Sequence, residues 1–168
     1  MSRAERSPAA YADPVRRIDL TTEISASPAL VFDTSLRVEV HTASMAGSRE
    51  RAIGGVTSGA LSLGDEVTWQ ARHLGRQWRM TSRITALDRP TYFVDEQVAG
   101  PFATWHHEHH FVSAPGGRTA MRDVIDFAAP HGLLGRFAEN AFLERYMARL
   151  IAIRNRHLAA VCTRIGPQ

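Results

Sequence analysis

The segment from Tyr92 to Phe127 constrains the fold of this chain more than any other part of the sequence. Breaks at Pro90, at residues 100–101 and at residues 115–117 divide it into three stretches, and residue types alternate with period two inside each stretch. Alternation of this kind predicts strands whose two faces differ. Because only short turns separate them, the strands are expected to be neighbours in an antiparallel sheet.

One face of each of these strands mixes apolar side chains with polar ones. In sequence order, the three rows are Phe93, Asp95 and Gln97; Trp105, His107, His109 and Phe111; and Met121, Asp123, Ile125 and Phe127. A buried polar group costs free energy unless it is paired, so an ordinary hydrophobic core does not carry rows of this kind. The rows predict instead the wall of a cavity that binds a molecule with both polar and apolar parts.

The rest of the sequence supplies a first strand, a hairpin and helices. Residues 17–26 alternate as a strand, Ser27 is a good helix N-cap, and residues 66–90 form two alternating strands joined near Gly75. From about Phe137 to Arg164 the chain has no glycine or proline, which predicts one long helix. Its expected apolar stripe consists of Phe142, Tyr146, Leu150, Ile153, His157 and Val161. The fold class is therefore α+β, and the long helix is the large element that can cover the sheet.

Composition limits the kind of protein. A chain of 168 residues is long enough for one domain, expected over residues 16–165 after a disordered leader at residues 1–15. No apolar run is long enough to span a membrane, and the single cysteine, Cys162, excludes an internal disulfide and favours a cytoplasmic protein. All 20 basic residues are arginine, but they are spread along the chain among acids, which argues against nucleic-acid binding. The sequence leaves a homodimer open.

Three phrases of the sequence resemble one protein superfamily. They are GDEVTWQARHLG (64–75), FVDEQVAGPFATWHHEHHF (93–111) and PHGLLG (130–135), read together with the order of the elements. The chain resembles the START/polyketide-cyclase superfamily, also called SRPBCC, and within it the bacterial cyclase/dehydrase-like members of unassigned function. The resemblance implies a helix-grip fold, in which a seven-stranded antiparallel sheet wraps around a long C-terminal helix and two short helices follow the first strand. It also implies a deep cavity for a hydrophobic or amphipathic small molecule, and it leaves the chemistry open.

The motif HHEHH at residues 106–110 offers two interpretations. His107 and His109 point to the same side of a strand, about 7 Å apart, and with Asp95 or Asp123 from a neighbouring strand they could bind Zn, Fe or Mn. Alternatively, these histidines form hydrogen bonds with Asp95, Asp123 or Gln97 inside a polar pocket, and the sequence favours this second interpretation. We therefore expect no metal and no other cofactor.

A histidine beside a carboxylate can also transfer protons, because the carboxylate raises the pKa of the imidazole toward neutrality. The candidate catalytic residues are His107, His109 and Asp123, acting in the pairs His107/Asp123 or His109/Asp95. A cyclase or dehydratase needs such a group. The same pairs can equally serve only to order the wall of the cavity, and the sequence contains no G-x-S-x-G nucleophile elbow.

The function that the sequence favours is binding of a hydrophobic or amphipathic small molecule, aromatic or lipid-like, between the sheet and the long helix. The expected ligand-binding residues are Asp95, Gln97, Trp105, His107, His109, Phe111, Asp123, Phe127 and Tyr146. Two alternatives remain: a cyclase or dehydratase that uses a His–Asp pair, and a protein-interaction module without a ligand of its own. The sequence leans toward a binding protein rather than an enzyme.

Overall fold

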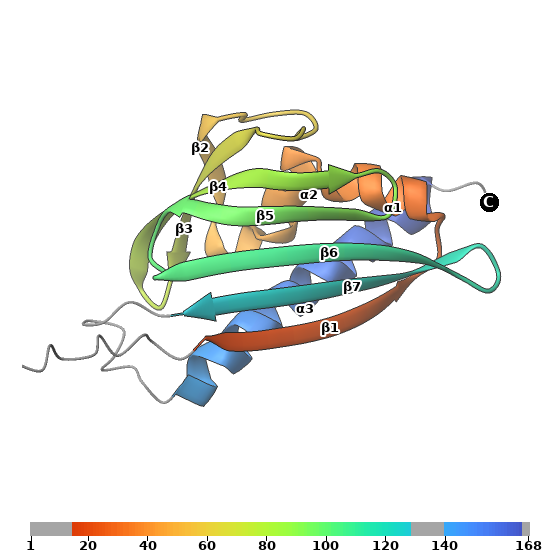
Figure 1. The fold of residues 1–168 in the computed structure, drawn as a ribbon. Helices are drawn as coiled ribbons and strands as arrows, with labels where there is room; N and C mark the ends of the chain where they lie inside the picture. The colour runs from red at the N-terminus through yellow and green to blue at the C-terminus, as the bar shows by residue number, and fades with distance from the viewer. Residues whose placement is uncertain (1–14, 129–139, 166–168) are drawn as a thin grey trace, which may run out of the picture.

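In residues 15–128 and 140–165, which this computed structural model describes, seven antiparallel strands form a curved sheet in the order β1-β7-β6-β5-β4-β3-β2 (Figure 1). The strands are β1 (Arg16–Ile24), β2 (Arg51–Gly55), β3 (Glu66–His73), β4 (Arg76–Asp88), β5 (Tyr92–Ala99), β6 (Thr104–Ala114) and β7 (Arg118–Ala128). The helices are α1 (Pro28–Ser35), α2 (Val38–Ser44), the one-turn 3-10 helix η1 (Ala46–Ser48) and α3 (Asn140–Ile165). The predicted α+β class, the seven-stranded sheet, the two short helices after the first strand and the long C-terminal helix are confirmed.

Local sequence signals set the boundaries of the early elements. Ser27 Oγ accepts a hydrogen bond from the backbone N–H of Leu30 at 3.4 Å, and Pro28 occupies the first turn of α1, where its missing N–H is not needed. The β3–β4 hairpin turns at Leu74 and Gly75, whose φ angles are 50° and 78°. A two-residue turn of this hand needs positive φ at both positions, which favours glycine at the second.

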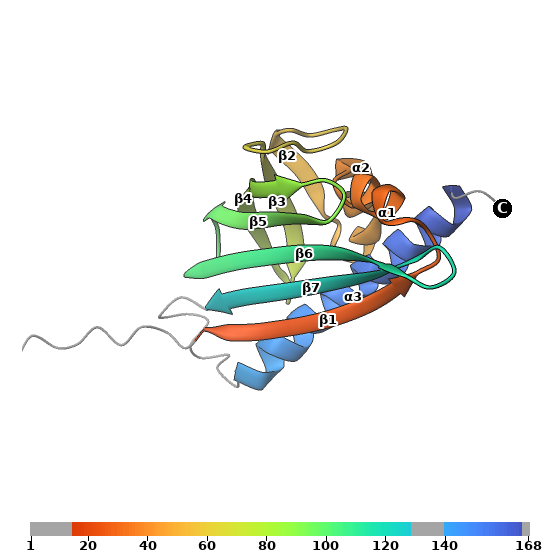
Figure 2. The ribbon, with the colours of Figure 1, turned by 45° about the vertical axis from the view of Figure 1, so that its right-hand side comes forward.

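The helices cover one face of the sheet. α3 runs diagonally behind the sheet in both views, and α1 and α2 pack against it on the same side (Figures 1 and 2). The opposite face carries charged side chains that pair across β1 and β7: Arg17 with Asp126, Arg122 with Asp19, and Arg118 with Glu23. The sheet therefore has one charged outer face and one inner face directed toward α3.

The buried face of α3 differs from the predicted apolar stripe. Its least exposed side chains are those of Ile151, Arg154, Asn155, Leu158 and Cys162. Phe142, the first residue of the predicted stripe, is 47% exposed, and the other predicted members are only half-buried. The prediction was wrong about the centre of this face because two of its residues are polar, so the apolar pattern points to the neighbouring side of the helix.

A band of polar residues separates two apolar clusters between the sheet and α3. The first cluster includes Ile24, Phe32, Phe93, Phe111, Met121 and Leu158, and the second includes Ile18, Trp105, Ile125, Phe127 and Ile151. The order along β6 illustrates the arrangement, because Phe111 belongs to the first cluster, Trp105 belongs to the second, and His109 and His107 lie between them. The band is called the buried polar cluster below and consists of Thr22, Asp95, His107, His109, Asp123, Arg154 and Asn155.

Some expectations from the sequence fall outside the described residues. The predicted leader at residues 1–15 lies outside except for its last residue, and so do the PHGLLG phrase at 130–135 and the predicted helix start near Phe137. The structure describes α3 from Asn140 onward. Among the helices of the described ranges, none is long and apolar enough to cross a membrane.

Candidate functional site

Two histidines of β6 are held between two aspartates from the neighbouring strands. His107 Nε2 lies 2.9 Å from Asp123 Oδ1 on β7, and His109 Nε2 lies 2.9 Å from Asp95 Oδ2 on β5. The other ring nitrogens face the opposite aspartates: His107 Nδ1 is 3.5 Å from Asp95 Oδ2, and His109 Nδ1 is 3.0 Å from Asp123 Oδ1. Alternation along β6 puts both rings on the inner face, with their centroids 3.7 Å apart. Each imidazole therefore contacts both carboxylates.

The Asp123 carboxylate, which is completely buried, is fixed by residues from α3. Its Oδ2 accepts a hydrogen bond from Asn155 Nδ2 at 2.7 Å, and its Oδ1 accepts one from Arg154 Nη1 at 3.4 Å. Asn155 Nδ2 also donates to Thr22 Oγ1 on β1 at 3.1 Å, and Arg154 Nη1 donates to Asn155 Oδ1 at 3.2 Å. Elements from both ends of the chain thus position the carboxylate that orients the histidine rings.

The protonation states follow from burial and from these contacts. Burial raises the pKa of Asp95, but the charge that His107 carries in acid and the hydrogen bond with His109 outweigh burial and lower that pKa below its usual range. Burial likewise opposes ionisation of Asp123, yet the hydrogen bond from His107 and the contact with His109 hold its pKa well below the ordinary value. Burial, and next the neighbouring His109, lower the pKa of His107 to about 4. Both carboxylates are therefore ionised at pH 7, and His107 is neutral.

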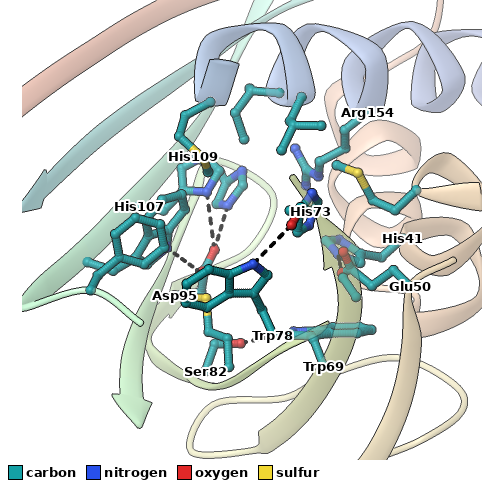
Figure 3. Close-up of a pocket in the computed structure, with 18 of the residues that line it drawn as sticks. His41, Glu50, Trp69, His73, Trp78, Ser82, Asp95, His107, His109 and Arg154 are labelled. Carbon is teal, nitrogen blue, oxygen red and sulfur yellow. Dashed lines mark hydrogen bonds and ion pairs between the residues drawn. The ribbon is translucent and has the colours of Figure 1, made fainter. Parts of the chain in front are cut away.

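Asp95, His107 and His109 line one side of a cavity between the sheet and the helices, and Arg154 of α3 also lines it (Figure 3). The cavity has a volume of about 220 Å³. Most of the other lining residues are apolar, and they come mainly from β3, β4 and β5, from the loop after β5, from α3 and from residues 35–50. Examples are Val38, Met45, Met80, Ile84, Phe102, Leu143, Met147 and Ile151. A molecule inside would meet charged and hydrogen-bonding groups on one side and mainly apolar side chains elsewhere.

A second set of polar side chains lies across the cavity from Asp95. His41 Nε2 is 2.6 Å from Glu50 Oε1, and the His41 ring lies over Trp69 with a centroid distance of 4.3 Å. His73 Nδ1 is 2.8 Å from the Tyr146 hydroxyl. Figure 3 shows His41 and Glu50 on the side opposite Asp95 and His107. Each of these groups therefore already has a hydrogen-bonding partner at the border of the cavity.

All three tryptophans of the chain line the cavity. Trp105 Nε1 donates to Asp95 Oδ1 at 3.3 Å, Trp69 Nε1 to Ser82 Oγ at 3.2 Å, and Trp78 Nε1 to the His73 carbonyl at 3.1 Å. Because each indole N–H already has an acceptor, the tryptophans offer ring surface to a ligand rather than a hydrogen bond. Their fluorescence is a direct probe of what enters the cavity.

The sequence-predicted binding residues divide into two groups. Asp95, Trp105, His107, His109 and Tyr146 line the cavity. The others are Gln97, Phe111, Asp123 and Phe127, and the structure places these away from the lining. The two phenylalanines pack in the apolar clusters at the two ends of the rows, and Asp123 lies behind the histidines. The roles of the lining residues stay predictions.

Gln97 holds a loop instead of facing the cavity, which differs from its predicted role. Its Nε2 donates to the Phe102 carbonyl at 2.8 Å, and the Phe102 backbone N–H donates to its Oε1 at 3.2 Å. The loop closes tightly over this amide, since a Cβ on Gly100 would collide with the Gln97 side chain. Phe102, which Gln97 positions, does line the cavity. Gln97 therefore shapes the site through its neighbour.

The other two histidines of the HHEHH motif belong to the outer face. His106 Nδ1 lies 2.9 Å from Glu96 Oε1, and its Nε2 lies 3.2 Å from Glu108 Oε1. His110 Nε2 lies 2.9 Å from Glu108 Oε2. These side chains are about one-third exposed and continue the charged surface described for β1 and β7. The motif thus serves two faces with different environments.

Sequence reasoning predicted Tyr146 of α3 but missed four other polar residues of the site that lie outside the strands. Arg154 and Asn155 sit in α3, His41 sits in α2, and Glu50 lies just before β2. Polar residues in a helix are ordinarily interpreted as facing solvent, and residues 36–55 have no clear period. His73 was recognisable, because it continues the inner row of β3 formed by alternate residues.

The cluster offers three kinds of chemistry at the cavity wall. The Asp95 carboxylate can accept hydrogen bonds, and the histidines can accept or donate them depending on tautomer. A neutral His107 oriented by Asp123 can take up a proton. Asp95, His107 and His109 also each offer one potential metal-ligand atom, and these three atoms lie within 4.8 Å of one another.

Comparison with family models agrees with this arrangement. A model described as polyketide cyclase/dehydrase and lipid transport matches residues 15–163. The match covers every strand of the sheet and nearly all of α3. The chain belongs to this family. The description of the family includes both catalysis and transport, so membership does not choose between an enzyme and a carrier. Comparison with curated protein sequences found no match.

Solved structures share the fold at low sequence identity. The Zhui aromatase/cyclase from a Streptomyces species has a TM-score of 0.73 and 15% identity, with 90% of this chain and 95% of that chain covered. A START superfamily protein from Mycobacterium smegmatis has a TM-score of 0.69 and 9% identity, covering 89% of this chain and 98% of that chain. A major latex-like protein from Panax ginseng gives 0.60 and 14%, over 88% and 97%. The family member therefore has the helix-grip fold of the START/SRPBCC superfamily.

Proposed function

We propose that the protein binds a small aromatic molecule of one or two rings that carries a hydroxyl group. The observation that carries this proposal is the position of the Asp95 carboxylate. This carboxylate is ionised and lies at the wall of a largely apolar-lined cavity, where its Oδ2 contacts both His107 and His109. A carboxylate in such a place binds a hydrogen-bond donor favourably, because few water molecules compete for it.

The size of the cavity supports a small ligand. An engineered protein cavity of about 150 Å³ accommodates benzene, while pockets for drug-sized molecules measure about 300 to 1,000 Å³. The cavity here, at about 220 Å³, falls between these cases. One or two rings match this volume, whereas a four-ring polyketide or a lipid with two acyl chains exceeds it.

The lining supports an aromatic ligand with one polar edge. Trp78, Trp105 and Phe102 present ring surface, on which a flat molecule can stack or make edge contacts. Asp95 already accepts one hydrogen bond at each oxygen, from Trp105 and from His109. A carboxylate has about four acceptor sites, so capacity remains for a ligand hydroxyl. The side chain is 21% exposed, which leaves room for that contact.

We expect 2-naphthol to bind the metal-free protein at least about tenfold more tightly than 2-methoxynaphthalene, a difference of about 1.4 kcal/mol. The hydroxyl can donate to Asp95, whereas the methoxy group leaves the carboxylate without this partner after water has been displaced. Isothermal titration calorimetry measures both affinities, and tryptophan fluorescence shows whether the compounds enter the cavity.

The comparison between the two compounds decides the proposal. Equal affinities would show that the buried polar cluster does not receive the ligand hydroxyl. Absence of binding by both compounds up to their solubility limits would overturn the ligand class and favour a protein-interaction module.

A second function, acid–base catalysis, is supported by the orientation of His107. Its Nε2 is hydrogen-bonded to Asp123, while the other nitrogen, Nδ1, lies on the side of Asp95, which lines the cavity. A carboxylate that fixes one nitrogen of an imidazole leaves the second nitrogen oriented as a base. Removal of a proton from the carbon beside a ketone, with the electron pair passing to the carbonyl oxygen, is the step that aldol-type cyclisation requires.

This second function predicts that the protein accelerates deuterium uptake at the methyl group of 2-acetonaphthone in D₂O, followed by NMR. His107→Gln is expected to lower the acceleration by at least about 100-fold, the usual contribution of a general base, while 2-naphthol still binds. The matched control, His106→Gln on the outer face, is expected to keep the wild-type rate. Exchange no faster than in buffer would leave ligand binding as the function.

A further inference from the structure

We propose that Asp95, His107 and His109 bind a divalent transition-metal ion, with Zn²⁺ the best match, at the wall of the cavity. This inference deepens the proposed function, since the ion would hold the ligand hydroxyl, and it rests on that function for this role alone. Metal binding itself requires no organic ligand and is testable without one.

The first argument is a count of protons. The two rings make four nitrogen-to-carboxylate contacts of 2.9 to 3.5 Å, two to Asp123 and two to Asp95. A neutral imidazole carries one N–H and one lone pair, so two neutral rings supply two donors for four acceptor contacts. With both rings in the neutral form, two ring lone pairs face carboxylate oxygens. His109 Nδ1 illustrates the deficit, because it is buried and finds no well-aligned hydrogen-bond partner among the described residues.

A cation on the Asp95 side removes this conflict. If both N–H groups point to Asp123, they are His107 Nε2–H and His109 Nδ1–H. The remaining lone pairs, on His107 Nδ1 and His109 Nε2, then converge on the same oxygen, Asp95 Oδ2. Two imidazole lone pairs and one carboxylate directed at a common point form the ligand set of many zinc and iron sites.

Two of the three separations between ligand atoms match those expected around a zinc ion. Ligand atoms about 2.0 to 2.2 Å from Zn²⁺ and separated by angles of about 90 to 110° lie about 2.9 to 3.5 Å from each other. The observed separations from Asp95 Oδ2 are 3.5 Å to His107 Nδ1 and 2.9 Å to His109 Nε2. The full set of three atoms falls within 4.8 Å.

Asp123 supplies the outer support that metal-binding histidines require. Such histidines usually donate their second ring N–H to a carboxylate, which fixes the tautomer and strengthens the ligand. Asp123 occupies this position for His107 and lies 3.0 Å from Nδ1 of His109, and Arg154 and Asn155 hold it in place. A carboxylate that serves only as a surface ion-pair partner would not need this complete burial or two further donors from α3.

The site leaves coordination positions open toward the cavity. All three ligands line the cavity, and a zinc site with three protein ligands has a fourth position for water or substrate. With neutral histidines, two aspartates and Arg154 sum to a charge of −1, and a divalent ion changes the sum to +1. A phenolate or hydroxide oxygen would restore neutrality, which agrees with a hydroxyl-bearing ligand.

The test is a Co²⁺ titration of the untagged chain of 168 residues after treatment with EDTA and dialysis. We expect one Co²⁺ per chain with micromolar or tighter affinity, seen as visible d–d absorption that Zn²⁺ abolishes by displacement. Elemental analysis after dialysis against Zn²⁺ gives the stoichiometry. A wild-type protein that binds neither ion at these concentrations would overturn the proposal and would mean that protons alone balance the cluster.

Variants locate the ion. Asp95→Asn and His107→Gln are each expected to weaken binding by at least about tenfold, as loss of a ligand or of its support does. The double variant His106→Gln/His110→Gln removes the two outer histidines of the same motif and is expected to bind as wild type. Loss of binding in that double variant, with binding retained in Asp95→Asn or His107→Gln, would assign the ion to the outer face and overturn the proposal.

Failure of this inference is distinguishable from failure of the proposed function. Calorimetry with 2-naphthol on EDTA-treated protein tests the ligand cavity without metal, and the Co²⁺ titration tests the metal without ligand. If 2-naphthol binds and Co²⁺ does not, the ligand proposal stands and the metal proposal is rejected. If Co²⁺ binds and 2-naphthol does not, the reverse holds.

Discussion

Asp123→Asn is expected to lower the free energy of unfolding by about 3 to 5 kcal/mol at pH 7, the usual cost of removing one partner from a buried charge pair. Arg154 is 7% exposed and would lose the only carboxylate to which it donates a hydrogen bond among the described residues. The new amide would also turn an N–H toward either the donor of Asn155 or that of His107. Chemical denaturation followed by far-UV circular dichroism measures the loss.

Asp126→Asn is the matched control, because Asp126 lies on the outer face of the same strand and pairs with the exposed Arg17. Its loss is expected to be below about 1 kcal/mol, as for surface ion pairs. The folded pKa of Asp123 lies below its unfolded value, so its stabilisation is present above about pH 4 and is lost as the pH falls through the folded pKa. The difference in free energy of unfolding between wild type and Asp123→Asn should therefore become smaller in acid. Equal losses in the two variants would contradict this account of the cluster.

Ala71→Phe is expected to abolish measurable binding of 2-naphthol, a loss of at least about 100-fold or about 2.7 kcal/mol. Ala71 lies on the inner face of β3 opposite Trp78 and lines the cavity. A phenyl ring added there would occupy a large part of a space of about 220 Å³. The new ring enters existing space, so the cost in stability is expected to stay within the range of about 1 to 3 kcal/mol found for overpacking. Calorimetry and thermal unfolding measure the two effects.

Arg72→Phe places the same side chain on the other face of the same strand. Arg72 is exposed, and its neighbour across the hairpin is Gln77. This control is expected to bind 2-naphthol as wild type does. Binding that survives Ala71→Phe would show that the compound sits elsewhere on the protein, and binding lost equally in both variants would point to a general effect on the fold.

Alternation in the sequence was enough to predict the inner row of β6 and its neighbours. Because side chains alternate along a strand, His107 and His109 must lie on the same face of β6 as Trp105. Short turns make β5 and β7 the neighbours of β6. The structure pairs His107 with Asp123 and His109 with Asp95, as the residue rows suggested. Strand register in a meander is local information, which explains why this part of the cluster was accessible.

The helical part of the cluster was not accessible from the sequence. Whether Arg154 faces solvent or a carboxylate depends on how α3 lies across the sheet, and that depends on contacts far away in the chain. The apolar pattern of α3 predicts a buried face that is shifted by about one residue from the observed one. The reason is that two polar residues, Arg154 and Asn155, lie at the centre of the observed buried face. Gln97 is a similar case. Its side chain forms hydrogen bonds with the backbone of Phe102 in the following loop and does not line the cavity as its position in the β5 row predicted.

The contact between β1 and α3 at Asn155 affects how ligand binding changes the stability of the fold. The hydrogen bond from Asn155 to Thr22 joins residues 133 positions apart, and Asp123 accepts from the same amide. Partly folded chains that lack α3 lose one wall of the cavity, and those that lack β1 lose the contact of Thr22 with the cluster. Anything that binds there binds the complete fold alone and raises its stability by RT ln(1 + [L]/Kd), about 2.7 kcal/mol at a concentration 100 times Kd. A rise in melting temperature therefore shows that a compound occupies the cavity, whatever the chemistry of that compound.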